Sequence, residues 1–354
     1  MTTDPASSNA VETPQKPKPV GAKLGSARTA LVYDTDAGDR ETVQTLSCLA
    51  TYEDTLTEDE RVLYGEEAAR QYPDRTSFML RSGLPTDAAS AELTAQFFGE
   101  VCDGYALPEE SAVVYAIPTI GDEVGLANLT TVIEESAVGE TLVRGFPESL
   151  CASIPAIGDD LEAVEEIFVA VNLGATTLEA CAYRHGEQLL PFVSEAATGN
   201  DVDERIADAV ESEIDGRIGI DRTTAREYKE EHADFDDFES FTDVVQRPDE
   251  GSHEFAVERG IMEPLDEYLD DVVDELVAFF SKLANAHMRT YQLSRTRPLV
   301  VTGGMACIPG LIAELETRLS EALDREVTLC VPENPDTAAA EGAYRIATRL
   351  LEQH

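Results

Sequence analysis

The chain has 354 residues, 43% of them hydrophobic, and a formal net charge of −44 from 70 acidic and 26 basic residues. This length predicts two domains of about 100 to 200 residues each, and the hydrophobic fraction can fill their cores. So acidic a surface repels nucleic acid and anionic lipid headgroups, which excludes both as partners at ordinary salt. The even spread of acid and the scarcity of Lys favour a halophilic cytoplasm, where salt screens self-repulsion, over an acidic protein of an ordinary cell.

The six cysteines form no CxxC pair, and most lie inside apolar runs. We interpret them as small buried residues in a reducing compartment, and predict neither a disulfide framework nor a metal site. No stretch reaches the roughly 18 apolar residues that a membrane span needs, and the N-terminus lacks the apolar core of a signal peptide. We therefore expect a soluble, cytoplasmic protein without a membrane span.

Residues 1–19 are rich in Pro, Ser and Thr without an apolar period, which predicts a flexible tail. The elements predicted next are a hairpin at 20–33, a strand at 43–50, a short helix and an extended piece within 64–85, a helix at 88–102, a strand at 111–118, a helix at 124–136, a strand at 143–147 and a helix starting at 149–154. This order indicates a mixed sheet covered by helices.

An acidic link at 158–166 leads to the second half. Its predicted elements are a hairpin at 169–183, an extended segment at 189–197, a helix from Val202 to about Arg217 capped by Asn200 or Asp201, a shorter helix capped by Thr223 or Thr224, an acidic insertion or small sheet at 230–258, one long amphipathic helix at 261–293, a strand at 298–306, a helix at 308–321, a strand at 327–331 and a closing helix at 336–351.

The two predicted hairpins have similar turns. Lys23-Leu24-Gly25-Ser26 in the first half corresponds to Asn172-Leu173-Gly174-Ala175 in the second. Turns of small residues let backbone N–H groups approach an anion such as phosphate. Each turn alone also fits an ordinary core hairpin. The pair predicts two related domains that face one ligand.

A third glycine-rich turn follows the buried strand near residue 300. Gly303 and Gly304 lie between that strand and the next helix. Backbone N–H groups in such a turn can lie beside a phosphate or a nucleoside. A plain strand-to-helix turn has the same pattern, so both interpretations stay open.

Taken in order, these segments resemble the actin-like ATPase superfamily, most closely the bacterial rod-shape actins (MreB) and the haloarchaeal actin homologues (salactin and volactin). The matching segments are two phosphate loops at 21–33 and 169–182, a connecting segment at 65–85, a glycine-acid turn at 198–204, a segment at 221–229, an adenosine loop at 300–311 and a C-terminal segment at 333–343. The resemblance implies an α/β, two-domain actin-like fold, a duplicated ribonuclease H-like unit with an interdomain nucleotide cleft. The implied domains are residues 20–157 and 158–354, with the closing helix packed back on the first.

The resemblance further implies that the cleft binds ATP, or alternatively GTP. The residues that it assigns to the nucleotide are Lys23, Gly25, Ser26, Ala27, Asn172, Gly174, Ala175, Thr176, Thr177, Gly199, Lys229, Glu230, Gly303, Gly304 and Met305.

The departures from the family concern the metal and the chemistry. Each phosphate loop of the family begins with an Asp that holds a divalent cation, and these positions are Lys23 and Asn172 here. Mg²⁺ prefers carboxylate oxygen and water, so we predict no metal ligands, with Lys23 contacting the phosphates as a point charge. The water-positioning Glu of the family falls on Phe146, which cannot orient a water. Glu148 or Glu179 would have to take over, and we predict weak or absent ATPase activity.

The predicted function is a cytoskeletal subunit that binds a nucleotide and polymerises with copies of itself, for cell shape or intracellular positioning. A non-polymerising pseudo-ATPase regulator or adaptor is the alternative, and Lys23, Asn172 and Phe146 favour it. A sugar kinase or acid phosphotransferase would need a catalytic carboxylate at the cleft, for which the sequence offers no well-placed candidate. The fold alone cannot choose among these functions.

Overall fold

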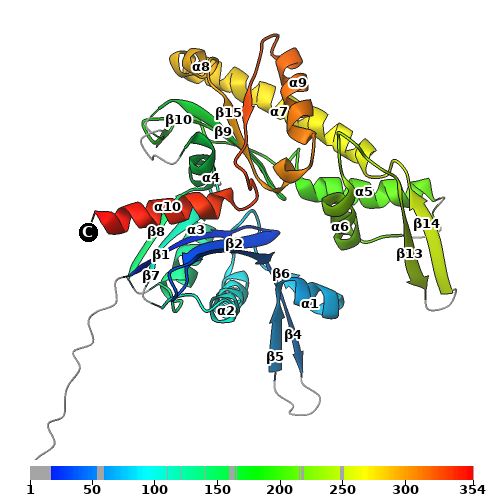
Figure 1. The fold of residues 1–354 in the computed structure, drawn as a ribbon, viewed down its shortest axis with the longest axis horizontal. Coiled ribbons are helices and arrows are strands. Elements are labelled where there is room, and N and C mark those ends of the chain that lie inside the picture. The colour runs from blue at the N-terminus through cyan, green and yellow to red at the C-terminus, as the bar shows by residue number, and fades with distance from the viewer. Residues whose placement is uncertain are drawn as a thin grey trace, which may run out of the picture.

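The computed structural model describes residues 17–53, 60–109, 111–119, 121–139, 141–158, 164, 166–214, 216, 219–247 and 251–353. Figure 1 shows two α/β bodies, one built mainly from the first half of the chain and the other from the second. The predicted flexible tail lies outside the described residues up to residue 16, and β1 (Lys18–Leu24) begins two residues earlier than expected.

The first body contains a five-stranded mixed sheet. Its strand order is β3 (Arg40–Leu46), β2 (Arg28–Asp34), β1, β7 (Ser111–Ile117) and β8 (Leu142–Pro147). The β1–β2 hairpin is antiparallel, whereas β7 pairs in parallel with both β1 and β8. Helices α2 (Ala88–Gly104) and α3 (Glu123–Glu134) cover one face, and α4 (Glu148–Ile157) and α10 (Ala338–Glu352) cover the other (Figure 1). This layering matches the mixed sheet with covering helices that the sequence predicts.

The single strand predicted at 43–50 is wrong, because the chain forms two strands there. β3 ends at Leu46, and β4 (Cys48–Glu53) joins β5 (Glu60–Tyr64) and β6 (Thr76–Phe78) in a separate sheet against α1 (Gly65–Gln71), which η1 (Pro73–Arg75) follows. At the break, the N–H of Ser47 donates to the carbonyl oxygen of Ala27 at 2.9 Å, and the Ser47 hydroxyl lies 2.9 Å from that of Thr29. The Ser47 N–H bond continues the β2–β3 ladder by one residue beyond the Arg28–Leu46 pair, and the chain enters the separate sheet directly after it.

The second body repeats the arrangement of the first. Its sheet runs β11 (Glu187–Gln188), β10 (Leu178–Arg184), β9 (Phe168–Leu173), β15 (Leu299–Thr302) and β16 (Leu329–Cys330), and β12 (Phe192–Ser194) also pairs with β10. As in the first sheet, an antiparallel hairpin is followed by a parallel partner, β15 beside β9. The similarity of the two hairpins in the sequence therefore reflects a shared local topology.

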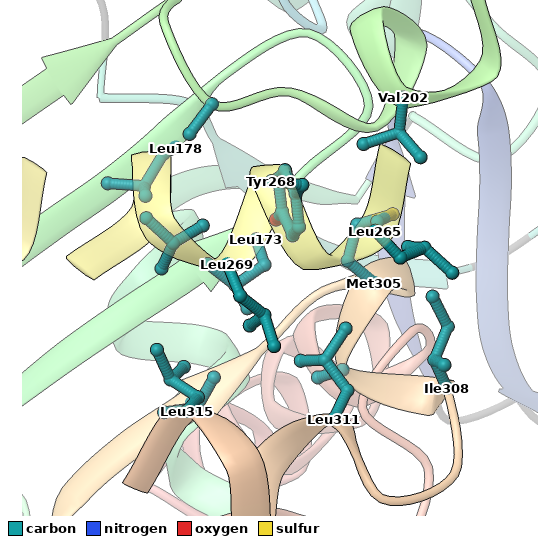
Figure 2. Packing of buried hydrophobic residues seen from close by; sticks show 14 of the residues in the cluster. Leu173, Leu178, Val202, Leu265, Tyr268, Leu269, Met305, Ile308, Leu311 and Leu315 are labelled. Atoms are coloured by element: carbon teal, nitrogen blue, oxygen red, sulfur yellow. The ribbon is translucent and has the colours of Figure 1, made fainter. Parts of the chain in front are cut away.

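One core cluster joins this sheet to its helices. Leu265 and Leu269 of α7 (Met262–Ala286) pack between Leu173 and Leu178 of the sheet and Leu311 of α9 (Leu311–Ala322), as Figure 2 shows. The i, i+4 spacing of the α7 leucines places them on one helix face. The prediction of one helix over 261–293 is wrong, because the chain leaves helical geometry at His287 (φ −138°, ψ 57°) before α8 (Met288–Ser294).

Two predicted helix caps lie two or three positions too late. The side chain of Thr198 accepts from Asp201 N at 3.2 Å and begins α5 (Gly199–Glu213), so neither Asn200 nor Asp201 is the cap. Asp221 accepts from Thr224 N at 2.8 Å and begins α6 (Arg222–His232), in place of the predicted threonines. In both helices the cap accepts from the N–H three residues later, as capping side chains do.

The segments around the second sheet refine other predictions. The acidic segment 230–258 contains a small sheet, as one of its two interpretations proposed, formed by β13 (Phe241–Arg247) and β14 (Gly251–Val257). The strand predicted at 298–306 ends at Thr302, and a 3₁₀ helix, η3 (Gly304–Cys307), follows it.

Four cysteines are buried, whereas Cys307 is exposed. Among the described helices, none combines the length and apolar character needed to cross a membrane.

Helix α10 ends the sequence but packs on the first sheet. A Cβ at Gly21 of β1 would lie 2.1 Å from the carbonyl oxygen of Ala340, and one at Gly342 would lie 1.8 Å from that of Cys151 in α4. Both glycines therefore allow backbone contact that no larger residue permits. The domain boundary at residues 157 and 158 stays a prediction.

Candidate functional site

A cavity of about 370 Å³ lies between the two hairpins and is lined by residues from both halves of the chain. Of the residues predicted to contact a nucleotide, all but Gly303 line it: Lys23, Gly25, Ser26, Ala27, Asn172, Gly174, Ala175, Thr176, Thr177, Gly199, Lys229, Glu230, Gly304 and Met305. The sequence therefore predicts a set of residues that the fold brings together from five separate segments of the chain, namely the two hairpins, α5, α6 and η3.

The two hairpin turns are built in the same way. Gly25 N donates to Arg28 O at 3.1 Å, and Gly174 N donates to Thr177 O at 3.0 Å. A Cβ would lie 2.7 Å from the acceptor oxygen at Gly25 and 2.8 Å from it at Gly174, so each turn excludes a larger residue. Both turns present small residues to the cavity, which leaves room for an anion to approach the backbone.

The turns also approach each other. The hydroxyl oxygens of Ser26 and Thr176 lie 3.2 Å apart, and Ser26 Oγ accepts from Gly83 N at 2.7 Å. The second turn is tied to α5, because Gly199 N donates to Gly174 O at 3.0 Å. The N-terminus of α5 is thereby held beside the second turn, where the helix dipole favours an anion, although the N–H groups of Gly199, Asn200 and Asp201 already donate within the protein.

Gly303 has a different position from the one predicted. Its φ is +97°, its N–H donates to Pro335 O at 3.0 Å, and a Cβ there would lie 2.4 Å from Leu173 O. It therefore lies behind the second turn, outside the lining of the cavity, and lets β15 lead into η3 close to β9. The next two residues, Gly304 and Met305, do line the cavity.

Lys23 and Asn172 converge on a buried carboxylate. Glu148, the first residue of α4, lies with its Oε1 3.2 Å from Lys23 Nζ and accepts from Asn172 Nδ2 at 2.9 Å. A carboxylate in the first turn of a helix is favoured by the helix dipole. The two side chains at the positions that the resemblance assigns to cation binding are therefore connected through Glu148.

Glu179, on β10, is a second carboxylate at the cavity. Its Oε2 accepts from Thr119 N at 3.0 Å, and only 2% of the residue is exposed. Burial first, and then the charge of Glu148, raise the pKa of Glu179 to about 7, although Lys23 acts in the opposite direction.

Phe146 does not line the cavity but packs with Leu150 and Cys151.

These residues do not fit a divalent cation. Within the described ranges no group of three or more His, Cys, Asp or Glu side chains could hold a metal ion. Relative to two aspartates, Lys23 and Asn172 change the charge from −2 to +1. Glu148 is already engaged by Lys23 and by Asn172. Mg²⁺ requires oxygen ligands in near-octahedral geometry, and this donor set does not supply them.

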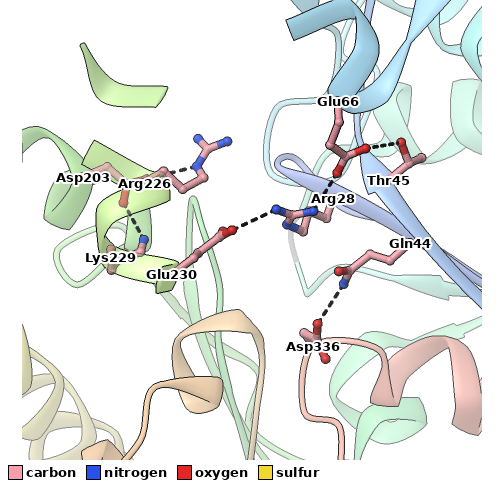
Figure 3. Close-up of polar contacts among 9 residues, drawn as sticks. All are labelled: Arg28, Gln44, Thr45, Glu66, Asp203, Arg226, Lys229, Glu230 and Asp336. Atoms are coloured by element: carbon pink, nitrogen blue, oxygen red, sulfur yellow. Dashed lines mark hydrogen bonds and ion pairs between the residues drawn. The ribbon is translucent and has the colours of Figure 1, made fainter. Parts of the chain in front are cut away.

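A buried ion-pair cluster forms another wall of the cavity. Asp203 of α5 lies 2.5 Å from Lys229 Nζ and 3.2 Å from Arg226 Nε, both on α6 (Figure 3). Lys229 also donates to Gly199 O at 3.3 Å. The sequence analysis named Lys229 but missed Asp203 and Arg226. The i, i+3 spacing of the two basic residues, which puts them on one face of α6, was the available signal.

Direct contacts also join the two sides of the cavity. Arg28 of β2 donates to Glu66 Oε1 of α1 and to Glu230 Oε2 of α6, each at 2.9 Å, and Gln44 donates to Asp336 at 3.0 Å (Figure 3). Burial lowers the pKa of Arg28, but Glu230 and Glu66 outweigh it and raise the value overall. Arg28 and Glu230 are 202 residues apart in the chain, so no local pattern could have revealed this contact.

Known proteins resemble this chain in sequence and in fold. Residues 17–351 match the family model described as Salactin. Salactin of Halobacterium salinarum is 52% identical over 339 residues, which cover 96% of this chain and 93% of that protein.

Solved structures support the fold at lower identity. The crystal structure of MreB5 of Spiroplasma citri bound to ADP has a TM-score of 0.76 at 17% identity and covers 96% of this chain and 99% of that one. The MamK double helical filament has a TM-score of 0.71 at 18% identity and covers 94% and 98%. The predicted α/β actin-like fold is thus confirmed, and the chain belongs to the Salactin family of actin-like proteins.

Proposed function

We propose that this protein is a cytoskeletal subunit that binds ATP in the cavity between its two hairpins and polymerises with copies of itself. The observation that carries this proposal is the pair of matching glycine turns, at Gly25 and Gly174, which face one cavity from opposite halves of the chain. MreB5 of Spiroplasma citri has been solved with ADP and with AMPPNP, which supports a nucleotide in the corresponding place. GTP has the same phosphates and is the alternative ligand.

In this proposal the two turns contact the phosphates, and Lys23 adds a positive charge between them. Gly199, Lys229, Glu230, Gly304 and Met305 lie on the walls formed by α5, α6 and η3, where they would contact the nucleoside. Backbone N–H groups at the glycine turns would contact phosphate beside Lys23, so the site needs no further cationic side chain. The site would therefore tolerate a strongly acidic surface elsewhere.

Assembly is proposed to be head to tail, because a heterologous contact that does not close into a ring produces a filament. The MamK structure is a double helical filament of a protein with this fold, and the Salactin relative is 52% identical. With a net charge of −44, subunits repel each other strongly at low salt. Assembly should therefore require the screening of a concentrated KCl solution, as in a halophilic cytoplasm.

Hydrolysis is proposed to be weak or absent. Phe146 packs away from the cavity, and Lys23 and Asn172 replace the carboxylates that would hold a metal. Glu148 and Glu179, which would have to replace Phe146, both line the cavity, but Lys23 and Asn172 bind Glu148, and Glu179 accepts from Thr119 N. A non-polymerising pseudo-ATPase regulator is the second candidate function, and the observation that favours it is the closed group of Lys23, Glu148 and Asn172.

Sedimentation and light scattering in concentrated KCl, with ATP, GTP, ADP or no nucleotide, test the proposal, with electron microscopy of the pellet and phosphate release from the same tube. We expect filaments that depend on nucleotide, with little phosphate released. Gly174→Ala should abolish this dependence, because its Cβ would lie 2.8 Å from Thr177 O. Gly99→Ala, where nothing lies within 4 Å of the new atom, is the matched control. A chain that stays monomeric in every condition would favour the regulator.

A further inference from the structure

Lys23 lines the cavity, and its ammonium group lies close to the first hairpin turn, 3.5 Å from where a Cβ at Gly25 would be. Lys23 comes from the end of β1 and Asn172 from the end of β9, and α4 brings Glu148 to both. The Lys23 side chain is 17% exposed and that of Glu148 is 9% exposed. Lys23 is therefore held in place by a buried carboxylate while it still borders the open cavity.

We propose that the nucleotide phosphates bind the fixed ammonium of Lys23 and that the site needs no divalent cation. This inference rests on the proposed nucleotide binding and specifies how the phosphates are neutralised. Lys supplies a compact positive charge with three donors, and its hydrogen bonds to phosphate oxygens are charge-assisted.

The contacts of Glu148 make a bound cation unfavourable. A cation coordinated to Glu148 Oε1 would have to displace both the Lys23 ammonium and the Asn172 amide. It would also lie beside the positive charge of Lys23, which repels it. The other carboxylates that line the cavity also have partners. Glu179 accepts from Thr119 N, Asp203 pairs with Lys229 and Arg226, Glu230 pairs with Arg28, and Asp336 accepts from Gln44. Glu148 acts in this arrangement as a positioning residue, because it directs Lys23 without itself contacting phosphate.

Equilibrium binding of ATP to the full chain in concentrated KCl, measured by calorimetry with excess EDTA and again with excess MgCl₂, tests the inference. We expect the two dissociation constants to agree within about threefold. Lys23→Met should weaken binding by about tenfold or more in both solutions, because a charge-assisted contact is lost. Lys18→Met is the matched control on the same strand, since Lys18 binds Asp36 and Thr35 O away from the cavity, and it should bind as the wild type does.

The reverse substitution gives an independent result. The double variant Lys23→Asp with Asn172→Asp restores two carboxylates, so it should bind ATP at least about tenfold more tightly with MgCl₂ than with EDTA. Circular dichroism and thermal unfolding establish whether each variant is folded. Should the double variant fail to fold, the comparison of the wild type with Lys23→Met decides the question.

Two results would overturn the inference, and they differ. Wild-type binding that appears in MgCl₂ and vanishes in EDTA would show that a divalent cation is required, while leaving the nucleotide site intact. Absence of ATP binding in both solutions would remove the nucleotide site itself, and this inference with it.

Discussion

Glu179 combines burial with a charge that the fold does not fully neutralise. The residue is 2% exposed, and burial together with Glu148 raises its pKa from 4.5 to about 7. Between these two pH values the unfolded chain releases the proton while the folded chain retains it, so the free energy of unfolding falls as the pH rises. Below about pH 4.5 both states are protonated, and the full stability is present. Above about pH 7 the carboxyl group is ionised in both states, and the decrease in the free energy of unfolding is complete.

Glu179→Gln should remove this pH dependence, because the amide does not ionise and its oxygen can still accept from Thr119 N. A pKa that rises from 4.5 to about 7 corresponds to at most about 3 kcal/mol. The free energy of unfolding of the variant, minus that of the wild type, should therefore rise by up to that amount between pH 4.5 and 7 and then stay level. Denaturant titrations across this range measure it. A constant difference would contradict the prediction, and Glu187→Gln, at an exposed site on β11, is the control.

At the level of elements, α10 depends on two glycines for its place on the first body. Gly21 lets the backbone of β1 meet the helix, and Gly342 lets the helix meet α4. The clusters around them are rich in alanine, including Ala339, Ala340 and Ala343. Small residues on both sides let the helix and strand backbones approach closely, so glycine and alanine residues determine how closely α10 packs.

Gly342→Ala should destabilise the protein although alanine is the better helix former. The new Cβ would lie 1.8 Å from Cys151 O, a backbone atom that cannot move aside cheaply, and overpacking of this kind costs about 1 to 3 kcal/mol or more. Gly99→Ala, within α2 and with no atom within 4 Å, should instead gain about 0.5 to 1 kcal/mol from helix propensity. Thermal unfolding of both variants compares them directly. Equal stabilities would show that α10 adjusts its position.

Elements defined by local patterns were predictable from the sequence. The paired turns at Gly25 and Gly174 need small residues for a local hydrogen bond, so their pattern is visible in the chain. Breaks imposed by tertiary contacts were not visible. The chain changes sheet at Ser47, between β3 and β4, within a continuous β pattern that carries no local signal of the change. The packing of the cavity walls likewise joins Arg226 to Asp203, 23 residues away, across two helices.

At the level of the whole molecule, a few side chains connect the two sides of the cavity. Arg28 joins β2 to α1 and α6 through Glu66 and Glu230, and Gln44 reaches Asp336 just before α10 (Figure 3). The Arg28 side chain is 30% exposed and that of Glu230 is 46% exposed. Contacts with this exposure typically contribute about 0 to 1 kcal/mol. They are therefore weak enough to open when a ligand enters or leaves.

Glu230→Gln should make the two sides of the cavity separate more often, since it removes the charge that Arg28 contacts from α6. With a contribution of at most about 1 kcal/mol, amide hydrogen exchange in β2 and α6 should accelerate by no more than about fivefold. Mass spectrometry of the nucleotide-free protein measures these rates. The difference from the wild type should shrink as KCl rises, because salt screens exposed charges. Glu231→Gln, at an exposed position on the same helix, is the control, and equal rates in both variants would mean that Arg28 and Glu230 do not hold the cavity closed.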